Sequence, residues 1–305
     1  MPVVLFRILT PSRTRRLLAA ASIGIAACSR SDRPPPTASI ATDDFGDTLR
    51  TGPRPTRIVS LMPPTTELLF AIGAGQRLVG RSTWDLQPAA ARLVPDLGVA
   101  LRPNVEAVLA ARPDLVILYA SEDNRDAARR LRAAGVQTAA YRIDRIADFA
   151  RVTEVLGRLT GDTAAARMTI DTVGRSLARV AAQTAVLPHP RAFWIAWENP
   201  LMAIGGGSWL SELLKVAGAR NVYDSLTAPS PPVTFEDLIR RDPDVVLASP
   251  AARARMLVDP RWRSLRAVRE GRVLTFDTTI VNGPTARLGS SALGLARVLH
   301  PDVVK

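Results

Sequence analysis

The stretch that decides the fold is residues 104–119, Asn-Val-Glu-Ala-Val-Leu-Ala-Ala-Arg-Pro-Asp-Leu-Val-Ile-Leu-Tyr. It predicts a helix over 104–111 and a strand over 115–119, because proline ends a helix and a short run of apolar residues is typical of a buried strand. Residues 234–248 repeat the pattern at an offset of 130, without a gap and with the Glu, the Pro-Asp pair and a Val unchanged. Helix, Pro-Asp and strand units are common in α/β proteins, but this match favours two related lobes.

The rest of the chain alternates short apolar runs with helical patterns, which is typical of an α/β fold with mostly parallel strands. Gly205-Gly206-Gly207 lacks the GK[ST] signature of a phosphate-binding loop and is interpreted as a flexible loop. The further predicted elements are strands at 57–61, 79–81, 137–141, 193–197, 244–248 and 271–276, and helices at 65–72, 124–134, 146–157, 209–217, 235–240 and 290–299.

A long helix is predicted between the two halves, over residues 162–185. Its apolar residues recur at intervals of three and four, which gives one buried stripe. Gly161 is expected to end the preceding helix and Asp162 to cap the long one. We therefore predict an α/β fold of two similar lobes, each a mostly parallel sheet flanked by helices. A rigid helix of about 35 Å joins them, with a ligand cleft between the lobes.

The N-terminus has the pattern of an export signal. Residues 1–27 carry four arginines and no acid, and they end in an apolar stretch too short to span a bilayer. Ile25-Ala26-Ala27-Cys28 resembles a bacterial lipobox, which would make Cys28 the lipidated first residue of the mature chain. An ordinary cleaved signal with an incidental cysteine remains an alternative. The predicted parts are a signal (1–27), a flexible polar tether (28–54), an N-terminal lobe (55–160), a linking helix (161–187) and a C-terminal lobe (188–305).

Composition excludes several classes of site. One cysteine forms neither an intramolecular disulfide nor a CxxC pair, and two histidines do not make an all-histidine metal cage. The net charge of +12 raises nucleic acid as a partner. Yet all but two of the 40 basic residues are arginine, which resembles a codon bias more than a polybasic face, so no nucleic-acid partner is expected. No GxSxG elbow is present and neither histidine has a triad-like neighbourhood, so no enzyme is predicted.

Three motifs together resemble one family. They are Arg57-Ile58-Val59-Ser60-Leu61 with Thr65-Thr66-Glu67-Leu68-Leu69-Phe70 and Gly73, then Val79-Gly80, then Asn104-Val105-Glu106 with Arg112-Pro113-Asp114-Leu115-Val116. The family is that of ABC-importer substrate-binding proteins for vitamin B12, haem and ferric siderophores. The resemblance implies a periplasm-facing monomer that delivers a nutrient to a permease dimer and its ATPase. The N-terminal lipid would be its only membrane contact. The protein would need no cofactor, although the expected ligands themselves carry cobalt or iron.

The resemblance also gives the internal repeat a role. In this family each lobe presents an exposed glutamate to arginines of the permease, and the matching residues are Glu106 and Glu236. Each follows a helix-capping residue by two positions, so favourable interaction with the helix dipole is the alternative explanation, and both roles can hold together. A scavenging lipoprotein without a permease is the alternative from another class.

The ligand is expected between the lobes, beside the carboxyl ends of the strands. Aromatic and apolar residues with few charges suit a bulky, partly apolar ligand. Cobalamin or a related corrinoid is the prediction, and a ferric siderophore held by arginines is the alternative. Haem is disfavoured because residues 98–102 offer neither the Tyr nor the His of the haem-binding members. The candidate ligand-binding residues are Pro63, Pro64, Trp84, Arg102, Tyr119, Trp197, Met202 and Asn282.

Overall fold

The computed structural model describes residues 39–50 and 53–304. Its first half contains a sheet of four parallel strands in the order β4-β3-β5-β6. Successive side chains of β3 and β5 point into two different hydrophobic clusters, so helices cover both faces of this sheet. The strands are β3 (Ile58–Ser60), β4 (Leu78–Arg81), β5 (Leu115–Tyr119) and β6 (Gln137–Tyr141).

The second half contains a sheet with the same topology. Its parallel strands lie in the order β9-β7-β10-β11, so the first strand in sequence again lies between the second and the third. A short strand, β8, adds to β7 in the antiparallel direction. We call residues 53–160 the N-lobe and residues 188–304 the C-lobe. The strands are β7 (Arg191–Trp197), β8 (Met202–Ala203), β9 (Arg220–Asn221), β10 (Val245–Ala248) and β11 (Val273–Thr275).

Equivalent hydrogen bonds also occur at matching positions within the two lobes. Asn104 and Thr234, which are 130 residues apart, each accept a hydrogen bond from a main-chain N–H of the helix that they cap. Asp114 and Asp244, at the same offset, each accept the main-chain N–H of the arginine that precedes or begins the first strand of their lobe. Matching strand order and matching side-chain contacts confirm the prediction of two related lobes.

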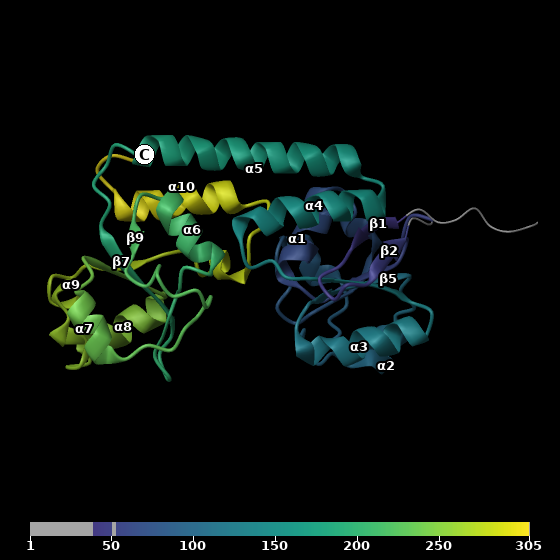
Figure 1. The fold of residues 1–305 in the computed structure, drawn as a ribbon, viewed down its shortest axis with the longest axis horizontal. Helices are drawn as coiled ribbons and strands as arrows, with labels where there is room; N and C mark the ends of the chain where they lie inside the picture. The colour runs from purple at the N-terminus through teal and green to yellow at the C-terminus, as the bar shows by residue number, and fades with distance from the viewer. Residues whose placement is uncertain (1–38, 51–52, 305) are drawn as a thin grey trace, which may run out of the picture. The chain divides into compact units, whose positions relative to one another are not determined.

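The helices form three groups around the sheets. α2 and α3 pack on the outer face of the first sheet, and α7, α8 and α9 pack on the outer face of the second. The inner faces share one continuous hydrophobic cluster with the other helices, and α5 lies along both α4 and α10 (Figure 1). The helices are α1 (Pro63–Ala71), α2 (Val105–Ala110), α3 (Glu122–Ala133), α4 (Ile146–Thr160), α5 (Thr163–Thr184), α6 (Trp209–Val216), α7 (Phe235–Arg241), α8 (Pro250–Val258), α9 (Arg266–Arg269) and α10 (Leu288–Leu299).

The long helix is present, and Asp162 is its N-cap residue as predicted, although not through its side chain. Gly161 ends α4 with a φ of 76°, as expected, and Ala166, Val173 and Val180 are the buried stripe of α5. Asp162 makes no capping hydrogen bond, because its carboxylate forms an ion pair with Arg77 of the N-lobe at 3.3 Å. None of the helices in the described part of the chain is both long and apolar enough to cross a membrane.

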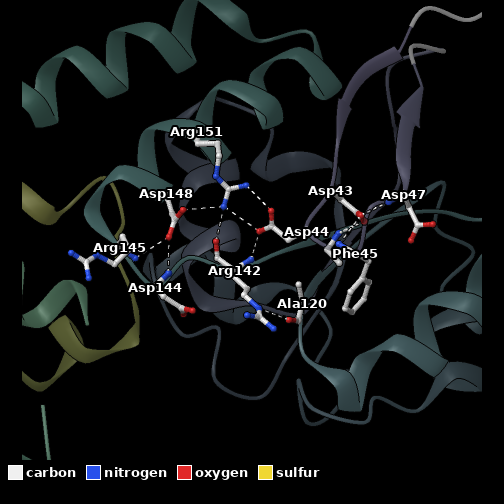
Figure 2. Close-up of polar contacts among 11 residues, drawn as sticks. Asp43, Asp44, Phe45, Asp47, Ala120, Arg142, Asp144, Arg145, Asp148 and Arg151 are labelled. Carbon is white, nitrogen blue, oxygen red and sulfur yellow. Dashed lines mark hydrogen bonds and ion pairs between the residues drawn. The ribbon is translucent and has the colours of Figure 1, made fainter. Parts of the chain in front are cut away.

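The prediction of a flexible tether over 28–54 is wrong for residues 39–50. Strands β1 (Ser39–Thr42) and β2 (Thr48–Arg50) form an antiparallel hairpin, in which Leu49 is buried. Asp43 accepts the N–H of Ala140 at 3.0 Å, and Asp44 pairs with Arg151 at 2.9 Å (Figure 2). These partners lie about a hundred residues away, so local composition does not reveal them. The expected signal and Cys28 fall outside the described residues.

The prediction of a flexible loop at Gly205-Gly206-Gly207 is also wrong. A Cβ atom on Gly206 would lie 1.9 Å from the carbonyl oxygen of Asp224, and similar collisions would occur at the other two positions. The main chain of this turn is therefore packed directly against residues 224–228, and Gly206 donates its N–H to the carbonyl of Leu226 at 2.8 Å. Glycine is required here by close approach of two backbone segments.

Candidate functional site

A cavity of about 760 Å³ opens at the carboxyl ends of the C-lobe strands β7, β10 and β11. Trp197 ends β7, Ser249 follows β10 and Phe276 follows β11, so the parallel sheet brings them to one edge. Asp144 of the N-lobe also borders the cavity. The other lining residues are Trp194, Ile195, Ala196, Glu198, Asn199, Ile204, Ser208, Trp209, Leu210, Pro229, Ser230, Ala252, Arg255, Thr278 and Val281.

Trp197 is the most prominent aromatic residue of this cavity. Its side chain is 63% exposed, and its indole N–H donates to the carbonyl of Asn199 at 3.0 Å. Met202 on β8 is its cross-strand neighbour. The indole ring is therefore held in place with its surface available, which suits stacking against a flat apolar ligand.

Three charged groups border the cavity. Glu198 accepts a hydrogen bond from Arg255 on α8, with Nε at 3.0 Å from Oε2, and this ion pair raises the pKa of Arg255. Asp144 is the third charged group, so the lining carries two carboxylates and one guanidinium. The cavity is thus slightly negative within a chain whose net charge is +12.

Asp144 is fixed from both lobes. Tyr119, the last residue of β5, donates its hydroxyl to Asp144 Oδ1 at 3.0 Å, and burial together with this carboxylate raises the pKa of Tyr119 to about 12. The main-chain N–H of Asp144 donates to Asp148, which also binds Arg151 (Figure 2). The main-chain carbonyl of Asp144 accepts the N–H of Trp209 on α6 at 2.7 Å, which is a main-chain hydrogen bond between the lobes.

Two ion pairs also join the lobes, and they are arranged reciprocally. Glu67 on α1 accepts two hydrogen bonds from Arg287, at 2.8 and 2.9 Å, and the carboxylate side chain is only 5% exposed. Glu212 on α6 pairs with Arg145 at 2.8 Å between Nε and Oε1. Each glutamate lies on the first α-helix of its lobe, α1 or α6, and each arginine immediately precedes the last helix of the other lobe, α10 or α4. The two pairs hold the lobes at equivalent points.

The predicted residues around α1 lie at a contact between the lobes. Pro63 begins α1 and is half-buried, whereas Pro64 is buried. A Cβ on Gly283 would lie 2.3 Å from Pro64 Cγ, so this glycine, with a φ of 130°, lets the C-lobe approach α1. Asn282 directly precedes that glycine, at the end of the 3-10 helix Thr278–Asn282.

The other predicted N-lobe residues do not line the cavity. Trp84 lies on the loop after β4 with 64% of its surface exposed. Arg102 has a φ of 54° and donates from Nε to Asp123 at 2.8 Å, so its charge is already compensated. The structure thus places Trp197 in the lining of the cavity. Tyr119 is hydrogen-bonded to the lining residue Asp144, and Met202 is the strand neighbour of Trp197.

Several residues of the site were missed at the sequence level. Helix α8, which carries Arg255, was not predicted, although Ser249-Pro250 is a recognisable start signal: Ser249 caps the helix by accepting the N–H of Ala252 at 3.2 Å. Glu198 follows a predicted strand directly and was overlooked. No local pattern points to Asp144, whose partners come from β5, α4 and α6.

The two predicted docking glutamates are both exposed. Glu106 on α2 has a side chain 74% exposed and pairs with Arg130 on α3 at 2.5 Å. Glu236 on α7 forms no ion pair with any residue of the described part of the chain. Within residues 39–50 and 53–304, no group of three or more His, Cys, Asp or Glu side chains is placed to hold a metal ion.

Comparison with known proteins identifies relatives over most of the chain. A family model described as periplasmic binding protein matches residues 58–279. A vitamin B12-binding protein of Vibrio parahaemolyticus serotype O3:K6 is 26% identical over 232 residues, which cover 76% of this chain and 84% of the relative. An uncharacterized ABC transporter substrate-binding lipoprotein of Bacillus subtilis is 27% identical over 262 residues, which cover 82% of each.

Solved structures of the same fold include proteins with different ligands. The periplasmic vitamin B12-binding protein of Vibrio cholerae has a TM-score of 0.71 and 24% identity, and the match covers 81% of this chain and 97% of that one. A periplasmic haem-binding protein of Pseudomonas aeruginosa has a TM-score of 0.72 and 26% identity, with coverage of 82% and 94%.

Proposed function

The chain belongs to the periplasmic binding proteins of ABC transporters, in the family whose members include vitamin B12- and haem-binding proteins, and on that premise we propose that it captures cobalamin or a related corrinoid. The observation that carries the proposal is the cavity beside Trp197, which is mainly apolar and aromatic. A corrin ring offers a wide flat face to such residues, and its amide side chains offer N–H donors to carboxylates such as Asp144.

The charge of the cavity lining favours a corrinoid over haem and ferric siderophores. Haem propionates and most ferric siderophores are anionic and would face a lining with one net negative charge. The only guanidinium of that lining, Arg255, is already paired with Glu198. Arg102, the arginine expected to favour a siderophore, pairs with Asp123 outside the cavity. A neutral or cationic ligand rich in amide donors fits this site better.

The same proposal includes delivery to a permease. Glu106 and Glu236 lie at matching places of the two lobes, on α2 and α7, as an approximately twofold partner requires. Glu106 would exchange Arg130 for an arginine of the permease on docking. Charge-assisted pairs of this kind set orientation and the rate of encounter more than affinity.

Lipid attachment at Cys28 completes the proposal. The described residues begin with β1 at Ser39, and ten residues lie between Cys28 and this strand in the sequence. Ten residues reach at most about 35 Å when fully extended. The protein would then work close to the membrane surface, within reach of the permease and its ATPase.

Tryptophan fluorescence titration tests the ligand. Cyanocobalamin and cobinamide are expected to quench the protein with a dissociation constant below about 10 µM, and haem and a panel of ferric siderophores are expected to bind more weakly. Trp197→Phe should reduce the quenching and weaken binding, because Trp197 is the exposed one of the three tryptophans that line the cavity. Trp262→Phe is the matched control, since Trp262 is buried on the outer side of the C-lobe sheet and should leave the response unchanged. If no corrinoid binds within that limit, the proposed ligand is wrong.

A further inference from the structure

The turn of residues 142–145, between β6 and α4, serves both the cavity and the contact between the lobes. Among the described residues of the N-lobe, Asp144 alone borders the cavity. Tyr119 donates to its Oδ1, and no other hydrogen bond to this carboxylate is formed within the described part of the chain, so Oδ2 can accept a donor of the ligand. The next residue, Arg145, pairs with Glu212 of the C-lobe. The position of this turn therefore sets a cavity group and a lobe contact together.

Asp44, in the loop between β1 and β2, binds the start of this turn. Its Oδ2 accepts the main-chain N–H of Arg142 at 2.6 Å, and its Oδ1 accepts a hydrogen bond from Arg151 on α4 at 2.9 Å. Arg151 also donates to the main-chain carbonyl of Arg142 at 2.9 Å. The N-terminal hairpin and α4 thus hold both main-chain polar groups of Arg142 (Figure 2).

Asp148, in the first turn of α4, binds the end of the same turn. Its Oδ1 accepts a hydrogen bond from Arg151 at 3.0 Å. Its Oδ2 accepts the main-chain N–H groups of Asp144 at 3.1 Å and of Arg145 at 2.9 Å. Because Arg151 bridges Asp44 and Asp148, an unbroken series of hydrogen bonds leads from the hairpin to the main chain of Asp144 (Figure 2).

Bonds to the main chain distinguish this network from an ordinary surface ion pair. An exposed ion pair contributes little to stability, and the side chains of Asp44 and Arg151 are 25% and 41% exposed. Here, however, the two carboxylates bind three main-chain N–H groups of one short turn, which fixes the path of its backbone. A binding group must be held within about 0.5 Å of its productive position. The network is therefore suited to position Asp144.

We propose that Asp44 is a positioning residue of the ligand site, which acts through Arg151 and Asp148 to hold Asp144 Oδ2 toward a donor group of the ligand. The N-terminal hairpin is then part of the binding apparatus, in addition to being the link toward the predicted lipid anchor. The inference rests on the proposed function for its effect on affinity, whereas its effect on the turn is independent of any ligand.

Hydrogen exchange on the ligand-free protein tests the effect on the turn. In Asp44→Ala, protection of the Asp144 and Arg145 amides should fall by at least about threefold, since both are bound to Asp148. The main-chain hydrogen bond from Asp44 to Ala140 remains in this variant and keeps the hairpin on β6.

Asp47→Ala is the matched control. It removes the same charge from the same hairpin, but Asp47 pairs with Arg132 on α3 at 2.6 Å and not with the turn. It should leave the protection of the Asp144 and Arg145 amides unchanged. Unchanged protection in Asp44→Ala, or an equal loss in both variants, would overturn the proposal, because an equal loss would reflect a general weakening of the hairpin.

A second variant keeps the test decisive if Asp44→Ala does not fold. Arg151→Lys keeps the positive charge but loses the planar fork that binds Asp44, Asp148 and the carbonyl of Arg142 at once. It should lower protection of the same two amides, and full protection in Arg151→Lys contradicts the proposal.

Titration with cyanocobalamin tests the effect on affinity through a double-mutant cycle. Asp44→Ala should weaken binding by about threefold to tenfold, which is the loss expected when one hydrogen bond is weakened, and Asp47→Ala should bind as the wild type does. In the Asp144→Ala background, Asp44→Ala should have less than about a twofold further effect, because the group that it positions is absent.

Additive losses in this cycle would show that Asp44 does not act through Asp144 and would overturn its role in binding. If cyanocobalamin does not bind the wild type, the proposed ligand is wrong, and the exchange data alone decide whether Asp44 positions the turn.

Discussion

Several single polar residues of this protein form hydrogen bonds with partners that lie far away in the sequence. Asp43 reaches Ala140, Glu67 reaches Arg287 and Asp144 reaches Trp209. The contacts of Asp43 and Glu67 each satisfy a buried carboxylate that would otherwise cost free energy, and the contact of Asp144 joins its main-chain carbonyl to the other lobe. Asp85 differs from the other three because its partners are near in sequence and neutral, so its burial remains costly at neutral pH.

Asp85 should leave a signature in the pH dependence of stability. Burial raises its pKa to about 6 in the folded protein, although the hydrogen bonds from Ser82 and Thr66 act in the opposite direction. In the unfolded chain its pKa is about 3.9. The folded state therefore binds the proton more tightly, and stability from this group is complete below pH 4 and lost as pH rises through 6. The gain on moving from pH 7.5 to pH 5 is about 1 kcal/mol, and at most about 3 kcal/mol below pH 4.

Urea denaturation of the wild type and Asp85→Asn at pH 7.5 and pH 5 measures this contribution. The difference in unfolding free energy between the two proteins should change by the stated amount between the two pH values. If that difference is constant, Asp85 is ionised with an ordinary pKa in the folded protein.

At the scale of elements, close contacts between backbone segments decide whether a glycine is required at its position. The Gly205-Gly206-Gly207 turn packs its main chain against carbonyl oxygens of residues 224–228. Gly174, on the exposed side of α5, has no atom within 4 Å of an added Cβ. The same residue type is thus indispensable in the turn and replaceable in the helix.

Alanine substitutions at these two places should have opposite effects. Gly206→Ala should destabilise the protein by more than about 2 kcal/mol, because the new Cβ displaces the backbone at Asp224. Gly174→Ala should stabilise it by about 0.5–1 kcal/mol, since alanine is the better helix former. Urea denaturation of both variants gives the two values, and a neutral Gly206→Ala would show that the turn adapts freely.

At the scale of the whole molecule, the two lobes share a core and are tied by reciprocal contacts. One hydrophobic cluster runs through α1, α4, α5, α6 and α10, and the Glu67–Arg287 and Glu212–Arg145 pairs connect the lobes at equivalent positions. The exposed glutamates on α2 and α7 follow the same twofold relation. The duplicated architecture therefore organises both the interior and the proposed docking surface.

Charge reversal separates transport from ligand capture. The double variant Glu106→Lys/Glu236→Lys should bind ligand as the wild type does, because both residues lie outside the cavity, and should abolish uptake by cells. Asp126→Lys, an exposed reversal on α3, should leave uptake intact. Normal uptake with the double variant would favour a scavenging lipoprotein that does not use these residues to dock.

The sequence by itself determined the α/β class, the parallel strands, the duplication and the long helix, because each depends on local periodicity or on a repeat visible along the chain. It also pointed to Trp197 as a residue at a strand end. Only the tertiary structure decided that residues 39–50 form a hairpin, that the glycine turn is packed and that Asp144, Glu198 and Arg255 border the cavity. Those features depend on contacts between segments tens to a hundred residues apart, and such contacts have no local signature.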